Sequence, residues 1–168
     1  MNKIGVFYGS TTGTTEDLAR RIAEKLNVPS AYIFEVSKLS DALVNEYDVL
    51  VLGSSTWGAG ELQDDWYDGV NVLKKCDLSH KYVALFGCGD SESYCDTFCD
   101  GMGIIYEDIK DSGCTIIGKV SAEDYSFSSS IAVIDGMFVG LALDDINESD
   151  KTEERIDAWV NDIKNHLA

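Results

Sequence analysis

Two short segments that are apolar almost throughout constrain the fold of this chain more than any other feature. They are Asp48–Gly53 and Tyr82–Gly87, and a shorter run of the same kind, Ile4–Tyr8, precedes them. A strand that is apolar on both faces has to be covered on both, which is typical of a parallel sheet. Helical patterns separate the runs, and such crossovers between parallel strands are right-handed. We therefore expect an α/β fold with a doubly wound, five-stranded parallel sheet.

Hydrophobic periodicity and turn residues predict the order of the elements. We expect strands at Ile4–Tyr8, Ala31–Val36, Asp48–Gly53, Tyr82–Gly87 and Thr115–Val120, and helices at Thr14–Leu26, Trp66–Leu73 and Phe98–Ile109. A last helix carries an apolar stripe and is expected to begin with a capping box of Asp150 and Glu153. The polar segment Ser121–Met137 interrupts the fifth strand, which resumes at Phe138–Leu143. Because no repeat or linker is visible, we expect residues 1–168 to form a single domain.

The turn after the first strand combines hydroxyl side chains, glycines and the start of a helix. It contains no Lys or Arg, and its residues are Gly9, Ser10, Thr11, Thr12, Gly13, Thr14 and Thr15. Backbone N–H groups, hydroxyls and the positive end of the helix dipole converge there, which favours an anion. The missing lysine disfavours a nucleoside triphosphate, and the missing G-x-G-x-x-G pattern disfavours a dinucleotide, so we expect a terminal monophosphate. The alternative is a threonine-rich helix cap that binds nothing.

The charge of the chain limits the classes of partner. Thirty acidic residues against thirteen basic ones give a net charge of −17, which disfavours nucleic acid and anionic membrane surfaces. Basic patches on other proteins are the expected partners, and the alternative is that the acidity serves solubility alone. Since no run approaches the ~18 apolar residues of a membrane span, we expect a soluble, cytoplasmic protein.

The cysteines indicate neither a disulfide framework nor a metal site. There are five of them, and the sequence contains no C-x-x-C pair. They are Cys76, Cys88, Cys95, Cys99 and Cys114. Cys95 and Cys99 could share a helical face, but two thiols alone make a weak metal site. We therefore expect reduced, mostly packed thiols and no metal.

Three loops are expected to meet at one edge of the sheet. Ligands of doubly wound sheets bind outside the carboxyl ends of the strands, where the strand order reverses. The loops there are the turn from Gly9, the loop around Thr56 and Trp57, and the loop Asp90–Tyr94. Trp57 stands next to a Gly-rich stretch and Tyr94 among polar residues, so we interpret both as ligand contacts. The alternative is that Trp57 is a core aromatic residue.

These loops, one after each of three core strands, resemble the flavodoxin family in its long-chain form, and the resemblance covers essentially the whole chain. It implies strand order 2-1-3-4-5, an interrupted fifth strand, and one flavin mononucleotide (FMN) bound without a covalent bond. The phosphate would lie at Ser10–Thr15, and the ring between Trp57 and Tyr94. The cofactor-binding residues that the resemblance implies are Ser10, Thr11, Thr12, Gly13, Thr14, Thr15, Ser55, Thr56, Trp57, Gly58, Ala59, Gly60, Cys88, Gly89, Asp90, Tyr94 and Cys99. Ser55 departs from the family, which often has proline there.

The resemblance also implies a function, that of a low-potential one-electron carrier which shuttles between semiquinone and hydroquinone states. A peptide at Gly58 would turn its carbonyl toward the reduced flavin, and glycine lowers the cost of the positive φ that this requires. Nearby carboxylates such as Asp90 and Glu61 would disfavour the anionic hydroquinone and so lower its potential. The implied partners are basic-faced redox proteins, such as a flavodoxin/ferredoxin-NADP reductase or a 2-oxoacid oxidoreductase, with the carrier itself a monomer.

Two other functions are compatible with the same sheet. A flavodoxin-like reductase would turn over NAD(P)H and quinones, but the site loops offer no basic residues for a second phosphate. A receiver-type phosphorylation switch needs an acidic cluster after the first strand and an Asp at the end of the third, where this chain has Gly9-Ser10 and Gly53-Ser54. The two histidines, His80 and His166, lie outside the three loops, so no catalytic triad is indicated and we expect no enzyme activity.

Overall fold

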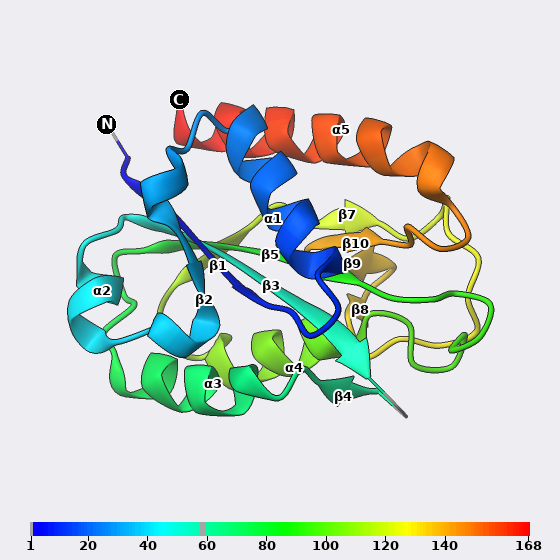
Figure 1. Cartoon of the computed structure of the whole chain (residues 1–168), viewed down its shortest axis with the longest axis horizontal. Helices are drawn as coiled ribbons and strands as arrows, with labels where there is room; N and C mark the ends of the chain where they lie inside the picture. Colours follow the sequence, from blue (N-terminus) through cyan, green and yellow to red (C-terminus); the bar gives the residue numbers. More distant parts are fainter. Residues whose placement is uncertain (1, 58–59) are drawn as a thin grey trace.

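A parallel sheet with helices on both faces forms the centre of the structure, a computed structural model that describes residues 2–57 and 60–168. The sheet runs in the order β10-β5-β3-β1-β2 (Figure 1). Its strands are β1 (Ile4–Gly9), β2 (Ile33–Glu35), β3 (Val49–Trp57), β5 (Tyr82–Cys88) and β10 (Leu141–Leu143). With β5 as fourth strand and β10 as fifth, this order confirms the predicted 2-1-3-4-5 arrangement.

The fifth position of the sheet is divided between two strands, as predicted. Strand β6 (Thr115–Ile117) pairs with the first half of β5, and β10 pairs with the second half. Between them the chain forms a small antiparallel sheet of β7 (Val120–Ser121), β9 (Met137–Phe138) and β8 (Val133–Ile134). Asp135 and Gly136, both with positive φ, make the tight turn between β8 and β9.

Two helices cover each face of the sheet (Figure 1). Helices α1 (Thr14–Lys25) and α5 (Ser149–Leu167) lie on one face, and α3 (Asp65–Lys75) and α4 (Asp100–Ile109) lie on the other. The short helix α2 (Asp41–Asn45) and the 3-10 turns η1 (Ser30–Tyr32) and η2 (Val36–Lys38) flank β2. In the described part of the chain, no helix is long and apolar enough to cross a membrane.

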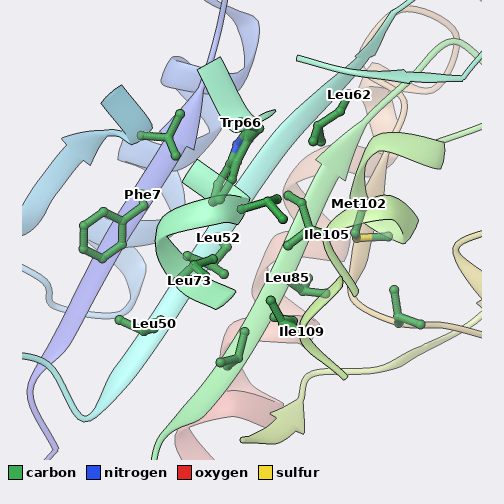
Figure 2. Packing of buried hydrophobic residues seen from close by; sticks show 14 of the residues in the cluster. Phe7, Leu50, Leu52, Leu62, Trp66, Leu73, Leu85, Met102, Ile105 and Ile109 are labelled. Carbon is green, nitrogen blue, oxygen red and sulfur yellow. The ribbon is translucent and has the colours of Figure 1, made fainter. Parts of the chain in front are cut away.

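The strands of the sheet send alternate side chains into two separate cores. In β3, Leu50 and Leu52 pack with α3 and α4, while Val49 and Val51 pack with α1 and α5. Figure 2 shows the first of these cores, where Trp66 and Leu73 of α3 lie over Leu52, and Met102, Ile105 and Ile109 of α4 lie near Leu85. Because strand side chains alternate with a period of two, a continuous apolar run supplies both cores at once.

Several element boundaries differ from the predictions. The third strand continues to Trp57, because β4 (Glu61–Leu62) folds back and pairs with Thr56 and Trp57. The predicted capping box is wrong: α5 begins at Ser149 after Glu148, and in the described residues no side chain caps it. Glu153 instead forms ion pairs with Arg21 and Lys25 of α1. Tertiary ion pairs have overridden the local pattern here.

Gly140 allows the chain to pass close to β5 just before β10 begins. A substitution at Gly140 therefore tests how tightly the two strands pack. A Cβ atom at Gly140 would lie 2.1 Å from the carbonyl oxygen of Leu85, in the backbone of a central strand that cannot move aside. We expect Gly140→Ala to lower the free energy of unfolding by about 2–3 kcal/mol. Gly136→Ala, where nothing lies within 4 Å and only the positive φ is strained, should cost about 1 kcal/mol. Urea denaturation of both variants measures the difference, and equal costs would contradict the packing argument.

Candidate functional site

A cavity of about 290 Å³ opens at the carboxyl ends of the sheet strands. The last residues of β3 and β5 and the segments that follow β1, β5 and β10 surround it, although they lie far apart in the sequence. The residues that line it are Thr12, Thr14, Ser55, Thr56, Trp57, Cys88, Gly89, Asp90, Tyr94, Thr97, Asp145 and Ile146. The three predicted loops therefore do meet at one place, and a fourth segment joins them.

The hydroxyl-rich turn forms one end of this cavity, at the start of α1. Gly13, with φ of 93°, occupies the N-cap position, and among the described residues no side chain caps the helix. The Gly13 N–H donates to Ser10 Oγ at 3.0 Å, which shapes the turn. The threonines therefore do not serve as helix caps. Thr12 and Thr14 line the cavity instead, beside the N–H groups of the first helical turn.

Thr15 ties the turn to the neighbouring strand. Its side chain is buried, and its hydroxyl shares a hydrogen bond of 3.2 Å with Sγ of Cys88 at the end of β5. Burial raises the pKa of the Cys88 thiol to about 11, although the hydrogen bond with Thr15 acts in the opposite direction. At neutral pH this cavity wall therefore presents a protonated thiol rather than a negative charge.

Trp57 and Tyr94 stand on the rim of the cavity and belong to neither core. Trp57 is 39% exposed and Tyr94 is 53% exposed, which is unusual for aromatic side chains of this size. The alternative interpretation of Trp57 as a core residue is therefore wrong. The indole N–H of Trp57 donates to Ser55 Oγ at 2.8 Å, and the hydroxyl of the neighbouring Thr56 accepts from the Gly101 N–H at 2.9 Å.

The loop that carries Tyr94 is built around Asp90. A carboxylate oxygen of Asp90 accepts from the backbone N–H groups of Glu92 and Ser93, at 3.2 and 2.9 Å. The Tyr94 N–H donates to the Asp90 carbonyl at 2.9 Å. The hydrogen bonds from Ser93 and Asn147 lower the pKa of the Asp90 carboxyl group. Asp90 is therefore a negative charge at the cavity, and it also holds the loop in shape.

Three cavity residues were missed by sequence reasoning. Thr97 follows Tyr94, and Asp145 and Ile146 follow β10. Ile146 is 71% exposed, so an aliphatic side chain lies at the rim near the two aromatic ones. The signal that could have found it is the rule already used for the other strands, because the resumed fifth strand also ends at this edge.

The other predicted site residues lie around the cavity without lining it. Ser10, Thr11 and Gly13 belong to the same turn, Gly60 packs against Asp100, and Thr15 and Cys99 are buried. Burial raises the pKa of the Cys99 thiol well above its ordinary value. Gly58 and Ala59, including the predicted peptide rotation at Gly58, lie outside the described residues. Within the described ranges, no three His, Cys, Asp or Glu side chains gather in a way that could hold a metal ion.

Comparison with known proteins agrees with this geometry. The flavodoxin family model matches residues 6–159 of the chain. The chain belongs to the flavodoxin family. A flavodoxin from Buchnera aphidicola is 43% identical over 164 residues, which cover 97% of this chain and 96% of the relative. Flavodoxin 1 from Escherichia coli K12 is 41% identical over 164 residues, covering 97% of this chain and 93% of the relative.

Solved flavodoxin structures share the fold. A Fusobacterium nucleatum flavodoxin bound to flavin mononucleotide superposes with a TM-score of 0.91 at 28% identity, and the match covers 99% of each chain. Oxidised Flavodoxin 2 from Bacillus cereus gives a TM-score of 0.72 at 25% identity, with 98% of this chain and 99% of that chain covered. Both matches extend over nearly the full length of this chain, which includes the four segments around the cavity.

The raised pKa of the Cys88 thiol predicts that this thiol reacts slowly near neutral pH. The thiolate is the reactive form, so with a pKa of about 11 only about one Cys88 in a thousand is reactive at pH 8. We expect iodoacetamide at pH 8 to label the partly exposed Cys95 and Cys114 while Cys88 stays unmodified, and Cys88 labelling to increase as the pH rises toward 11. Peptide mapping by mass spectrometry measures this, with protein unfolded in guanidinium chloride as control. Labelling of native Cys88 as fast as Cys95 would contradict the prediction.

Proposed function

We propose that this flavodoxin is a single-domain, low-potential electron carrier that binds one FMN without a covalent bond. It passes single electrons between redox enzymes and has no substrate of its own. The observation that carries the proposal is the cavity itself, which unites the uncapped start of α1, two exposed aromatic side chains and the end of β5 in a member of this family. The FMN of the Fusobacterium nucleatum structure supports the choice of cofactor.

The donor set at the start of α1 fits a phosphate. Hydroxyls of Ser10, Thr12 and Thr14, with the N–H groups of the first turn of α1, would hold it. The basic side chains of that helix are engaged elsewhere: Arg20 pairs with Glu16 at 3.1 Å, and Arg21 pairs with Glu153 at 2.7 Å. The phosphate would therefore be bound by neutral dipoles, which is how helix N-termini and turn concavities bind anions.

The other end of the cavity fits a flat, largely apolar ring. Trp57 and Tyr94 would stack on its two faces, and backbone groups of Gly89 and Asp90 would contact its polar edge. Each aromatic stacking contact is worth about 0.5–1.5 kcal/mol beyond the area that it buries. Bound FMN supplies the one-electron chemistry, while these side chains orient the ring and exclude water from its faces.

Carboxylates around the cavity would make added negative charge costly. Asp90 and Asp145 line it, and Glu61 pairs with Trp57 across the β3–β4 ladder. At a separation of about 12 Å and an effective dielectric constant of about 20, each carboxylate raises the energy of a new negative charge by about 1.4 kcal/mol. For a one-electron couple that corresponds to a potential lower by about 60 mV. Several such charges together would make the reduced protein a strong reductant.

The same acidity selects the partners of this carrier. A net charge of −17 favours redox proteins with a basic face, such as a flavodoxin/ferredoxin-NADP reductase or a 2-oxoacid oxidoreductase, and it steers their approach over long distances. The exposed rim formed by Trp57, Tyr94 and Ile146 would be the point of contact. We propose that the protein acts in the cytoplasm as a monomer.

Titration of the apoprotein with FMN tests the proposal. Flavin fluorescence should be quenched as one FMN per chain binds, and Trp57→Ala and Tyr94→Ala should each weaken binding by about tenfold because a stacking surface is lost. Tyr67→Ala is the matched control, since Tyr67 is 50% exposed on α3 and does not line the cavity. Its FMN affinity should equal that of the parent protein.

Two results would contradict the proposed function. One is an apoprotein that is folded by circular dichroism but binds no FMN. The other is an FMN-loaded protein that oxidises NADPH at a substantial rate without a second protein, since that would indicate a reductase. Gel filtration tests the proposed monomer independently of both.

A further inference from the structure

A buried carboxylate outside the cavity lining contacts the start of the Tyr94 loop. Asp144 directly follows β10 and its side chain is inaccessible to solvent. Its oxygens accept hydrogen bonds from the N–H of Ser91 at 3.0 Å, from the Ser91 hydroxyl, from the N–H of Asn147 at 3.0 Å and from the Asn147 side-chain amide at 3.0 and 3.2 Å. A buried charge is costly unless it is satisfied in this way. Asp144 therefore holds the segments of Ser91 and Asn147 in place.

The donors belong to two different segments that line the cavity. Ser91 stands at the start of the Tyr94 loop, and Asn147 closes the turn after β10 that carries Asp145 and Ile146. The Asn147 amide also donates to the Asp90 carboxylate at 2.8 Å. Burial raises the pKa of the Asp144 carboxyl group, but the hydrogen bonds from Ser91 and Asn147 outweigh burial and lower it. Asp144 is therefore ionised at neutral pH, and its charge joins the two segments.

The far end of the Tyr94 loop is fixed by a separate set of contacts. The N–H groups of Ser128 and Ser129, in the segment that interrupts the fifth strand, donate to the Cys95 carbonyl at 2.8 and 2.9 Å. Tyr94 thus lies between one anchor at Asp144 and another at Cys95. By contrast, the hydroxyl-rich turn is tied to the end of β5 through Thr15 and Cys88. The anchor at Asp144 acts on the ring end of the cavity and leaves the phosphate end to other contacts.

We propose that Asp144 is a positioning residue that holds Tyr94 and the Asp145–Asn147 turn in their binding positions before the cofactor arrives, and so sets the affinity for the flavin ring but not for the phosphate. This inference rests on the proposed function. A loop that is already ordered loses less freedom when a ligand binds, so the anchor raises affinity by preorganisation. Asp144 itself does not line the cavity.

FMN and riboflavin differ only in the phosphate, so binding of the two ligands tests this proposal. We compare FMN with riboflavin on the apoprotein and on Asp144→Asn, Ser91→Ala and Asn147→Ala. Each variant should bind both ligands about tenfold more weakly, so that the ratio of the two affinities stays as in the parent protein. Thr12→Ala, at the phosphate end, should instead weaken FMN more than riboflavin. Unchanged riboflavin affinity in a folded Asp144→Asn protein would overturn the inference.

A double-mutant cycle with Tyr94→Ala distinguishes positioning from a general loss of stability. If Asp144 acts through Tyr94, then Asp144→Asn should weaken riboflavin binding much less when Tyr94 is already Ala. Additive effects would overturn the inference. Trp159→Phe is the matched control, because it removes one buried hydrogen bond, from the indole N–H to the Gly118 carbonyl, on α5 and outside the cavity lining. It should lower the denaturation midpoint and leave both affinities unchanged.

A measurement on the apoprotein keeps this inference separate from the proposed function. In Asp144→Asn or, if that variant does not fold, in Asn147→Ala, the amides of Ser91, Glu92 and Ser93 should exchange with deuterium at least about tenfold faster than in the parent protein. Amides of α1 should be unaffected. If the parent protein binds no FMN, the proposed function fails whatever these rates are. If it binds FMN while the loop amides remain equally protected in the variants, only the positioning role fails.

Discussion

The pairing of β3 with β5, from Val49–Tyr82 to Ser55–Cys88, is the constraint on which the rest of the site depends. Both strands are buried on both faces, so their register cannot shift without exposing one of the two cores. Trp57 therefore leaves the sheet next to the place where Gly89 and Asp90 leave it. The first strand pairs with β3 on the other side and delivers the hydroxyl-rich turn to the same edge. The position of the cavity is a consequence of strand register, and the loops supply its side chains and backbone N–H groups.

Much of this architecture is readable from the sequence because the governing patterns are local. The apolar runs predict the buried strands, and the carboxyl-edge rule alone predicts that Thr12, Trp57 and Tyr94 meet. Where prediction failed, a contact distant in sequence decided the outcome. Glu153 pairs with cations of α1 and does not cap its own helix, and Ile146 enters the cavity only because the divided strand ends there. The cations that Glu153 meets cannot be identified from spacing along the chain, whereas the carboxyl-edge rule, applied to the resumed fifth strand, would have indicated Ile146.

The same cavity contains groups that favour an anion and carboxylates that repel one. The end of the cavity at the start of α1 offers neutral donors and a helix dipole, whereas Asp90 and Asp145 place carboxylates elsewhere in its lining. Cations of α1 are engaged in ion pairs with Glu16, Glu153 and Asp157. A strongly acidic chain can thereby bind an anionic ligand at one end and disfavour further negative charge at the other.

The divided edge strand has a consequence for how this chain could be remodelled. Ile117 is the last residue of β6 and pairs beside Ala84, while Leu141 is the first residue of β10 and pairs beside Phe86. The segment between them thus departs from and rejoins the sheet at points about 7 Å apart, two residues along one strand. So narrow a gap could be bridged by a very short linker or could host a foreign module with closely spaced ends. A graft of that kind would have to replace the support that Ser128 and Ser129 give to Cys95.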